Sequence, residues 1–499
     1  MTARALMIQG SSSSAGKSLL VAALCRIYRR RGQRVVPFKA QNMSNNSAVC
    51  RDGAEIGRAQ AVQAVAAGVE PAAEMNPILL KPQADAQSQV VVLGRRWTTL
   101  EAKGYFRRRD ELWPVVTVAF DRLRSQYDLI IIEGAGSPAE LNLRDNDIAN
   151  MAMARYAKAP VLLVGDIDRG GIFAQLLGTL DLLDADRPFV RGLIVNKFRG
   201  DPALFARGVG ILEQRSRLPV VGVIPFLKNL AIPEEDAVAL DDTNLLAKAN
   251  PGEIDIAVLR FPRISNFDDF DPLRAEPGIR VRYVESSASL GRPHAIVLPG
   301  SKSTMADLHW LRQTGLAHAV VNADCPIVGI CGGFQMLGKK LYDPDRVESS
   351  VKESDGLGLL PFTTTFYVAK QTCQVQAEIA PPPGRSWLVP LAGQPVTGYE
   401  IHMGKTAVTP PLLHIKQRNG IAVDETDGTS TPDGRIWGCY LHAVFANDLL
   451  RRTWLRTLGW TESGNPEGLH LDQRLDCLAD AVEAALDMDL IEQMIEQGL

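Results

Sequence analysis

The first half of the chain alternates short apolar runs with longer amphipathic stretches. Six apolar runs predict buried strands: Ala5–Gln9, Arg34–Phe38, Leu129–Ile132, Val161–Val164, Leu193–Val195 and Val220–Ile224. Amphipathic stretches between several of them predict helices: Ser18–Arg31, Ile56–Gly68, Asp145–Ala157 and Gly171–Leu183. Apolar strands that alternate with helices are typical of a parallel sheet covered on both faces. We therefore expect an α/β domain whose ligands bind beyond the carboxyl ends of its strands.

The alternation of apolar and amphipathic stretches is interrupted once and then resumes. Residues 241–252, DDTNLLAKANPG, are polar and end in a Pro-Gly pair, which predicts a linker after a first domain of residues 1–240. A second α/β domain, residues 253–446, begins with four further predicted strands: Ile254–Leu259, Val281–Val284, Ala295–Leu298 and Ile327–Ile330. Its part from Thr363 to Thr406 is rich in β-branched residues and predicts antiparallel strands. Residues 447–499 are expected to form a C-terminal tail, helical over Leu471–Leu499.

Composition narrows the class of protein. With 499 residues, 46% hydrophobic and 22% charged, the chain matches a globular protein of at least two domains. A net charge of -3 argues against nucleic acid or an anionic membrane surface as partner, and no apolar run approaches the roughly 20 residues of a membrane span. The seven cysteines show no paired spacing, which argues against disulfides or a zinc site. We expect a cytoplasmic protein, and the sequence leaves its oligomeric state open.

A phosphate-binding loop follows the first predicted strand. The segment GSSSSAGKS, residues 10–18, lies between a strand and a helix, so backbone N–H groups near Gly10, Ser14 and Gly16 are expected to bind ATP phosphates. Lys17 would reach the outer phosphates and the Ser18 hydroxyl would bind Mg²⁺. Five residues separate the two glycines instead of the usual four, a spacing that resembles the dethiobiotin-synthetase-like branch of P-loop proteins. The alternative is a serine-rich turn that only caps a helix.

Three further residues at strand ends or turns are candidates for this nucleotide site. Glu133 ends the run IIIEGAGS and is expected to join Ser18 on Mg²⁺, which prefers oxygen ligands. Asp52 is a second candidate ligand, although its Asp-Gly pair is also a common turn. Asn196 follows another strand and is expected to read the adenine edge, unless it only caps the next helix.

Two polar loops that also leave strand ends are candidates for substrate binding. They are QNMSNNS, residues 41–47, and DIDRGG, residues 166–171, and each combines polar side chains with backbone flexibility. The expected binding residues are Gln41, Asn42, Ser44, Asn45, Asn46, Asp166, Asp168 and Arg169. The alternative is that both are ordinary polar turns.

A cysteine in the second domain is the strongest single candidate for chemistry. Cys331 follows a predicted strand in GICGGFQMLG, and its glycine neighbours permit the sharp strand-to-helix turn that presents a nucleophile. The backbone N–H of Gly332 would stabilise an oxyanion, with Gly300 of the loop LPGSKST as a second donor. A buried structural cysteine is the alternative.

A cysteine nucleophile needs a base, and His442 in WGCYLHAVF is the preferred candidate among seven histidines. It follows an apolar run late in the second domain. His402, in GYEIHMG, is the runner-up and would otherwise shape the substrate pocket.

The second domain resembles the class I glutamine amidotransferase domains of the triad type. The resemblance covers Ile254 to Phe445 and rests on PGSKST, CGGFQ and YLHAVF. It implies an α/β fold in which Cys331 attacks glutamine with His442 as base. The triad family usually has a Glu two residues beyond the His, whereas this chain has Val444, so the sequence leaves open what orients His442.

With the first half added, the chain resembles the cobyric acid synthase family. The resemblance rests on these motifs in order: GSSSSAGKS, KAQNMSNNS, DGAEIGRAQ, NPILLKPQ, EGAGSPAE, DIDRGG and NKFRG. It implies ATP- and glutamine-dependent amidation of four carboxylates of a corrinoid, adenosylcobyrinic acid a,c-diamide. The related cobyrinic acid a,c-diamide synthases share this architecture. Rival functions are a nucleotide-switch ATPase with an inactive second domain, and a glutamine hydrolase that serves a separate synthase.

Overall fold

The structure is a computed structural model that describes residues 3–84, 87–101, 104–105, 107–227, 232–233, 252–382, 384–461 and 470–498. The chain forms two compact units. The first comprises Met1–Ser44, Ile56–Glu235 and Leu469–Leu499, and the second comprises Asn45–Glu55 and Asp236–Gly468. Of the predicted linker, residues 241–251 lie outside the described part of the chain.

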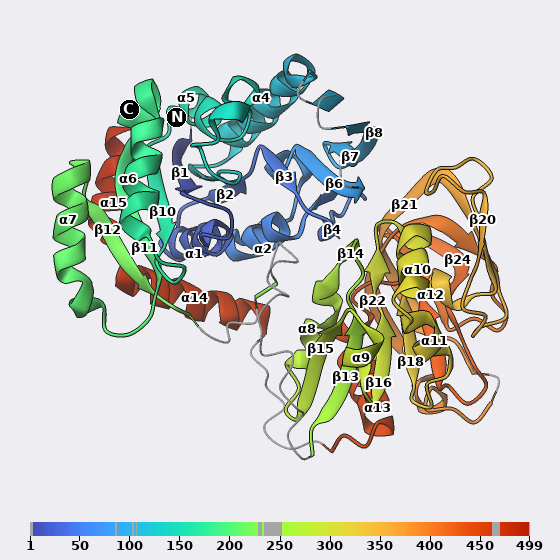
Figure 1. The fold of residues 1–499 in the computed structure, drawn as a ribbon. Helices are drawn as coiled ribbons and strands as arrows, with labels where there is room; N and C mark the ends of the chain where they lie inside the picture. Colours follow the sequence, from blue (N-terminus) through green and yellow to red (C-terminus); the bar gives the residue numbers. More distant parts are fainter. Residues whose placement is uncertain are drawn as a thin grey trace. The chain divides into compact units, whose positions relative to one another are not determined.

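The first unit is built on a six-stranded parallel sheet (Figure 1). Its strands, in spatial order, are β12 (Val220–Pro225), β11 (Val190–Phe198), β10 (Val161–Asp166), β1 (Arg4–Gly10), β9 (Leu129–Glu133) and β2 (Val35–Phe38). All six predicted strands are present, and β11 extends beyond the predicted Leu193–Val195 at both ends, to Val190 and Phe198. The parallel arrangement places every strand's carboxyl end at one edge, where the loops discussed below begin.

Helices cover both faces of this sheet, as the apolar runs predicted. Leu6 and Ile8 of β1 pack into one buried cluster, whereas Met7 between them packs into another, because successive side chains of a strand point to opposite faces. The first cluster is covered by α1 (Lys17–Arg30), α2 (Arg58–Ala67), α14 (Leu471–Ala485) and α15 (Met488–Gln497). The second is covered by α4 (Arg109–Gln126), α5 (Met151–Ala157), α6 (Ile172–Leu182) and α7 (Ala206–Ser216). A smaller sheet consists of β3 (Gln41–Met43), β6 (Ile78–Ala84), β7 (Gln87–Val92) and β8 (Arg95–Glu101).

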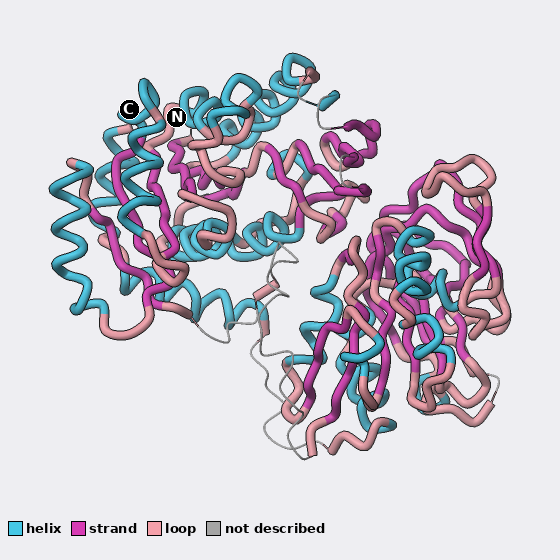
Figure 2. Tube along the Cα trace, viewed as in Figure 1, coloured by secondary structure: helices cyan, strands magenta, loops and turns pink. Residues whose placement is uncertain are grey.

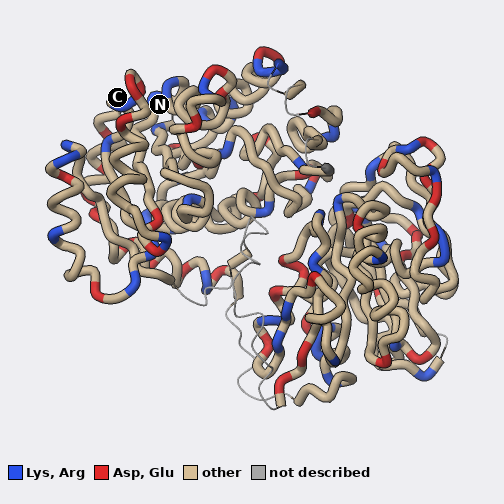
Figure 3. The backbone as a smooth tube through the Cα atoms, viewed as in Figure 1, with Lys and Arg blue, Asp and Glu red and all other residues tan. Residues whose placement is uncertain are grey.

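The C-terminal tail is divided between the units. Helix α13 (Asp448–Thr457) contributes to the core of the second unit, whereas α14 and α15 pack in the first. Arg26 of α1, almost fully buried, donates to Asp472 at 3.0 Å and to Asp476 at 2.8 Å on α14. Basic and acidic positions are interspersed along the chain in each unit (Figure 3). None of the helices in the described part of the chain has the length and apolar character that crossing a membrane requires.

The second unit contains a mostly parallel sheet and a mostly antiparallel one, whose strands are magenta in Figure 2. The first runs β15 (Ile279–Val284), β13 (Ile254–Leu259), β16 (Ala295–Leu298), β18 (Ile327–Ile330), β26 (Ile436–Cys439) and β25 (Thr429–Ser430), with only the last pair antiparallel. Three of its predicted strands, β13, β16 and β18, have the expected bounds. The second runs β20 (Glu353–Asp355), β19 (Lys340–Tyr342), β21 (Thr363–Ile379), β23 (Leu413–Arg418) and β24 (Ile421–Asp427). Strand β22 (Pro395–Thr406) pairs antiparallel with β21, which confirms the antiparallel strands predicted there.

Candidate active sites

The phosphate loop connects β1 to α1 and is held in a strained, compact shape. Gly16 has a φ of 96°, and a Cβ there would lie 2.1 Å from the amide nitrogen of Asn196. A Cβ at Gly10 would lie 2.8 Å from the backbone carbonyl oxygen of Ser12. Both positions therefore require glycine, and the loop leads directly into the positive end of a 14-residue helix.

Side chains from neighbouring strand ends fix the loop. The Lys17 Nζ donates to the carbonyls of Ser12 at 3.2 Å and Gly136 at 2.9 Å. The Asn196 amide donates to the Ala15 carbonyl at 2.8 Å, and its Oδ1 accepts from the Lys197 backbone N–H at 2.9 Å. Asn196 thus supports the phosphate loop, and its adenine contact stays a prediction.

A buried carboxylate lies beside the first turn of α1. The Ser18 hydroxyl donates to Glu133 at 2.8 Å, and Lys39 and Gln63 donate to the same carboxylate at 2.8 and 2.6 Å. Burial alone would raise the pKa of Glu133, but Lys39 and the other donors hold it below its ordinary value. Glu133 is therefore ionised at neutral pH. No local sequence pattern indicated that Lys39 and Gln63 belong to this site.

The chemistry of this cluster fits Mg²⁺. Ser18 and Glu133 offer hard oxygen atoms, and Mg²⁺ in phosphate-transfer sites is usually held by one or two protein ligands together with phosphate and water. In the described part of the chain, no group of three or more His, Cys, Asp or Glu residues is arranged to hold a metal ion. Asp52 belongs to the second unit, where its carboxylate accepts from the Ala54 backbone N–H at 3.0 Å. The structure does not group Asp52 with this pair, and its metal role stays a prediction.

The first candidate substrate loop is divided between the units. Gln41 accepts a hydrogen bond from the Tyr105 hydroxyl, and Asn42 donates to Gln60 at 2.9 Å, both within the first unit. Ser44 continues there, with its backbone N–H on the Leu80 carbonyl. The predicted binding residues Asn45 and Asn46 instead fold with the second unit.

The second candidate substrate loop is tied to the phosphate loop. Lys197 donates to Asp166 at 3.0 Å and to the Ser14 carbonyl at 2.8 Å. Asp168 forms an ion pair with Arg199. The Arg169 guanidinium lies 3.8 Å from Asp166. Asp166 is thus linked to the phosphate loop through Lys197, and the substrate role of Asp166, Asp168 and Arg169 stays a prediction.

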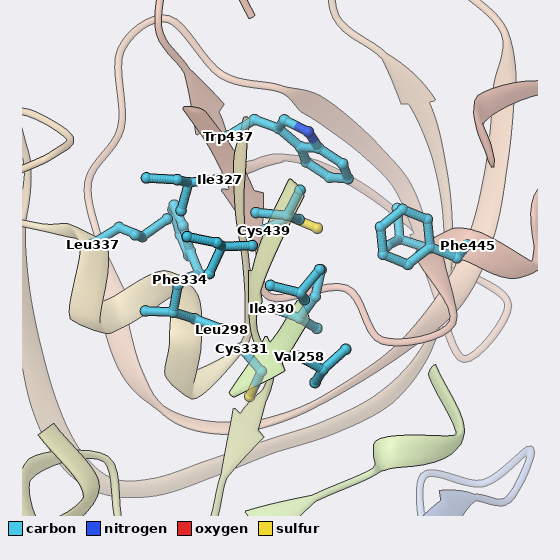
Figure 4. Close-up of a cluster of buried hydrophobic side chains, with 14 of the residues drawn as sticks. Val258, Leu298, Ile327, Ile330, Cys331, Phe334, Leu337, Trp437, Cys439 and Phe445 are labelled. Atoms are coloured by element: carbon cyan, nitrogen blue, oxygen red, sulfur yellow. The ribbon is translucent and has the colours of Figure 1, made fainter. Parts of the chain in front are cut away.

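Cys331 occupies a strained turn between β18 and α12 (Gly332–Leu337). Its φ is 50°, a left-handed conformation that non-glycine residues rarely adopt. A Cβ at Gly333 would lie 2.0 Å from the Leu298 carbonyl oxygen. Cys331 lies at the margin of an apolar cluster that includes Val258 and Phe334 (Figure 4). The predicted elbow is therefore present, with its thiol held at the end of a buried strand.

His442 is paired with a carboxylate that no local sequence motif indicated. Its Nδ1 lies 2.7 Å from Oδ2 of Asp269, on the short helix η7 (Phe267–Phe270). The other oxygen of Asp269 accepts from the Ala443 backbone N–H at 2.7 Å. Both side chains are almost fully buried. Asp269 therefore orients His442 in this chain, where Val444 replaces the expected Glu.

The Asp269 carboxylate also sets the charge of His442. Burial alone would lower the pKa of the imidazole, but Asp269 and the hydrogen-bonded Cys331 outweigh it and raise the pKa to about 10. The thiol of Cys331 also approaches the Ile401 carbonyl at 3.6 Å. His442 is thus hydrogen-bonded to Cys331, the arrangement in which a histidine serves a cysteine nucleophile.

The predicted oxyanion donors lie next to this pair. A Cβ at Gly300 would lie 3.0 Å from the ring carbon Cε1 of His442, so a side chain there would crowd the imidazole. A Cβ at Gly332 would lie 2.9 Å from the backbone nitrogen of Ser301. The structure thus adds Ser301 to the donor candidates, and the oxyanion role of all three stays a prediction.

A series of hydrogen-bonded polar side chains lies beside the same turn. Gln335 of α12 accepts from Thr304 at 3.0 Å and donates to the Tyr440 hydroxyl at 3.2 Å. His402, the runner-up base, stacks on the Tyr440 ring at 3.8 Å. His402 therefore lines this polar region, whereas His442 is the histidine that is hydrogen-bonded to Cys331.

Comparison with known proteins assigns both halves. Residues 6–238 match the family model for the CobQ/CobB/MinD/ParA nucleotide binding domain, and residues 255–450 match that for the CobB/CobQ-like glutamine amidotransferase domain. The curated cobyric acid synthases of Chloroflexus aurantiacus and Roseiflexus castenholzii are each 52% identical over all of both chains. The cobyric acid synthase of Sorangium cellulosum is 48% identical over 99% of both. A solved structure, PurLQS from Thermotoga maritima, covers 41% of this chain at 18% identity and a TM-score of 0.30, too weak a likeness for structural inference.

Proposed function

We propose a division of chemistry between the two units, starting from the fact that this chain belongs to the cobyric acid synthase family. The chain amidates the b, d, e and g carboxylates of adenosylcobyrinic acid a,c-diamide in cobalamin synthesis, with ATP and glutamine as co-substrates. The observation that carries the division is the pairing of Cys331, His442 and Asp269 in one unit, with the phosphate loop in the other.

The first unit activates the acceptor. A carboxylate resists ammonia because its oxygen is a poor leaving group, so the γ-phosphoryl of ATP passes to it and forms an acyl phosphate and ADP. Lys17 and the start of α1 hold the phosphates and stabilise the charge of the transferred group. Mg²⁺, held by Ser18 and Glu133, would neutralise further phosphate charge when bound. Lys39 keeps Glu133 ionised and ready for that role.

The second unit supplies ammonia. The Cys331 thiolate attacks the side-chain amide carbon of glutamine, and the backbone N–H groups of Gly332, Gly300 and Ser301 stabilise the oxyanion. His442 gives its proton to the departing nitrogen, so ammonia leaves and a thioester remains. Water then attacks the thioester, with His442 as base, and glutamate leaves. Ammonia displaces phosphate from the acyl phosphate and forms the new amide.

The combination of a cysteine–histidine–aspartate site with a phosphate loop favours this function over the two alternatives. A nucleotide switch with an inactive second domain would not need a strained cysteine, an imidazolium and an orienting carboxylate together. A glutamine hydrolase for a separate synthase would not need a phosphate loop in the same chain. None of the seven cysteines, all within the described residues, forms a disulfide, and we propose a cytoplasmic location for the enzyme.

Product analysis tests the proposed substrate. The full chain is incubated with adenosylcobyrinic acid a,c-diamide, ATP, Mg²⁺ and glutamine, and the products are separated and weighed by mass spectrometry. We expect a final product with four additional amides. A substrate left unchanged here, together with two amides gained by cobyrinic acid, would assign the chain to the a,c-diamide reaction instead.

A further inference from the structure

A short segment from the first half of the sequence folds with the second unit. Residues Asn45–Glu55 belong to the amidotransferase unit, although the chain enters the segment from Ser44 and leaves it at Ile56, both in the nucleotide-binding unit. It includes strand β4 (Ser47–Val49) and a turn in which the Cys50 N–H donates to the Ala54 carbonyl at 2.7 Å. Neither the reaction nor the phosphate site explains why these residues fold with the second unit.

One end of the segment holds the turn that carries Asp269. The Ser47 backbone N–H donates to Oδ1 of Asn266 at 3.1 Å, and both residues are buried. Asn266 adopts a left-handed φ of 52°, and its carbonyl accepts from the Asp269 backbone N–H at 3.1 Å. Ser47 therefore fixes the strained residue at the start of η7, and with it the position of the carboxylate.

The middle of the segment packs behind His442 and Cys331. Val49 forms a small buried cluster with Tyr399 and Ile401 of β22. The Tyr399 ring stacks on His442 with centroids 5.1 Å apart and planes 12° apart, and its carbonyl accepts from the His442 N–H at 2.9 Å. Ile401 supplies the carbonyl that the Cys331 thiol approaches. One valine thus supports the immediate neighbours of both reacting side chains.

The far end of the segment is locked by a buried ion pair. Glu55 pairs with Lys370 of β21 and accepts from the Ser47 hydroxyl at 2.7 Å. Gln374 of the same strand donates to the Val49 carbonyl at 3.1 Å. Removing one partner of a buried pair leaves an uncompensated charge, so this contact resists small displacements of the segment.

We propose that Asn45–Glu55 is a positioning element of the glutaminase triad, through which the nucleotide-binding unit controls glutamine hydrolysis. The inference rests on the proposed function, because Gln41–Ser44, the loop predicted to bind the corrinoid, continues directly into the segment. Acceptor bound at that loop stabilises Ser47 and Val49 in the positions that align Asp269 and His442. Glutamine is then hydrolysed faster when an acceptor that can use the ammonia is bound.

The test uses Val49→Ala and Glu55→Gln in the full chain, with Val320→Ala as control. Val320 is a fully buried valine of α11 (Leu316–Val321) in the same unit, so its truncation leaves a comparable cavity away from the segment. For each protein, kcat and KM for glutamine hydrolysis are measured with and without ATP and adenosylcobyrinic acid a,c-diamide. Ammonium-supported amidation and the pH profile of glutamine hydrolysis are measured alongside.

We expect both segment variants to lower the acceptor-stimulated kcat about ten- to a hundredfold, since small misplacements of reacting groups carry costs of that size. Stimulation by the acceptor should disappear, and the alkaline limb of the pH profile should move to lower pH because His442 is less firmly held beside Asp269. Ammonium-supported amidation should stay within about twofold of wild type. A merely structural role would not move the pH profile.

Two results would overturn the inference. One is that both segment variants hydrolyse glutamine at the wild-type rate, with the same stimulation by the acceptor and the same pH profile. The other is the same loss of stimulation in Val320→Ala. If Val49→Ala fails to fold, Glu55→Gln decides alone. Absence of ammonium-supported amidation in the wild type would instead refute the proposed function, so the two failures are distinguishable.

Discussion

The carboxylate of Asp269 gives the sharpest prediction for the amidotransferase site. In Asp269→Asn, one of the two oxygen acceptors becomes an NH₂ donor. The wild-type carboxylate accepts from both the His442 ring and the Ala443 N–H, so the amide can satisfy only one of them. We expect the His442 ring to lose its orientation and its proton, and glutamine hydrolysis to fall.

The size of the effect follows from the charge of His442. Its pKa rises from 6.5 to about 10, which at about 1.4 kcal/mol per pH unit favours the imidazolium by about 5 kcal/mol. Asp269 is the largest favourable cause of that rise, followed by Cys331. In the serine triads the same Asp-to-Asn change lowers kcat about 10⁴-fold. We therefore expect a loss of between about 10² and 10⁴ in kcat for glutamine.

The assay measures glutamate release across pH with saturating glutamine. In the wild type, activity that needs protonated His442 persists until pH approaches its raised pKa, whereas in Asp269→Asn the alkaline limb should shift toward the ordinary value of 6.5. Asp271→Asn, an acidic residue two positions away, is the matched control and should remain near wild type. Glutamine hydrolysis in Asp269→Asn within about threefold of wild type would refute the assigned role.

Three other changes test other parts of the structure. Glu133→Gln should abolish ammonium-supported amidation while glutamine hydrolysis without acceptor continues, as followed by corrinoid mass and glutamate release. Burial raises the pKa of Asp307 to about 7. The stabilisation by the protonated carboxyl is therefore complete below its ordinary pKa of 3.8 and is lost as pH rises toward 7, by at most about 1.4 kcal/mol per pH unit. Thermal melts of Asp307→Asn should show a stability that changes less between pH 5 and 7 than that of wild type. Asp476→Ala should destabilise α14 by about 1–2 kcal/mol in hydrogen exchange, because its buried partner Arg26 loses a charged hydrogen bond, whereas the exposed pair of Asp480 should contribute under about 1 kcal/mol.

Local patterns predicted most of the fold because they depend on near neighbours. The strands β13, β16 and β18 have the expected bounds, since each is a short apolar run between polar turns. The strained turn at Cys331 was also predictable, because glycines at 332 and 333 are required by backbone that approaches them closely. Strand bounds and tight turns of this kind are determined by residues close together in the sequence.

Long-range placement explains what the sequence left open. Asp269 lies 173 positions from His442, in the turn NFDDF with two adjacent aspartates, and no local pattern distinguishes the one that reaches the imidazole. An acidic turn after the first strand of the domain was the only signal. The excursion of Asn45–Glu55 depends on contacts with β21 and β22, more than 300 residues later. Lys39 was missed for the same reason, because its partner Glu133 lies on another strand.

The division of labour between the two units is the central claim, and Cys331→Ser tests it most directly. Corrinoid amidation by this variant is measured with glutamine and, separately, with ammonium salts, alongside wild type. We expect glutamine-dependent amidation to be abolished, because serine does not form the reactive thiolate, and ammonium-supported amidation to stay within about twofold of wild type. Loss of ammonium-supported amidation, or persistence of glutamine-dependent amidation, would contradict the account.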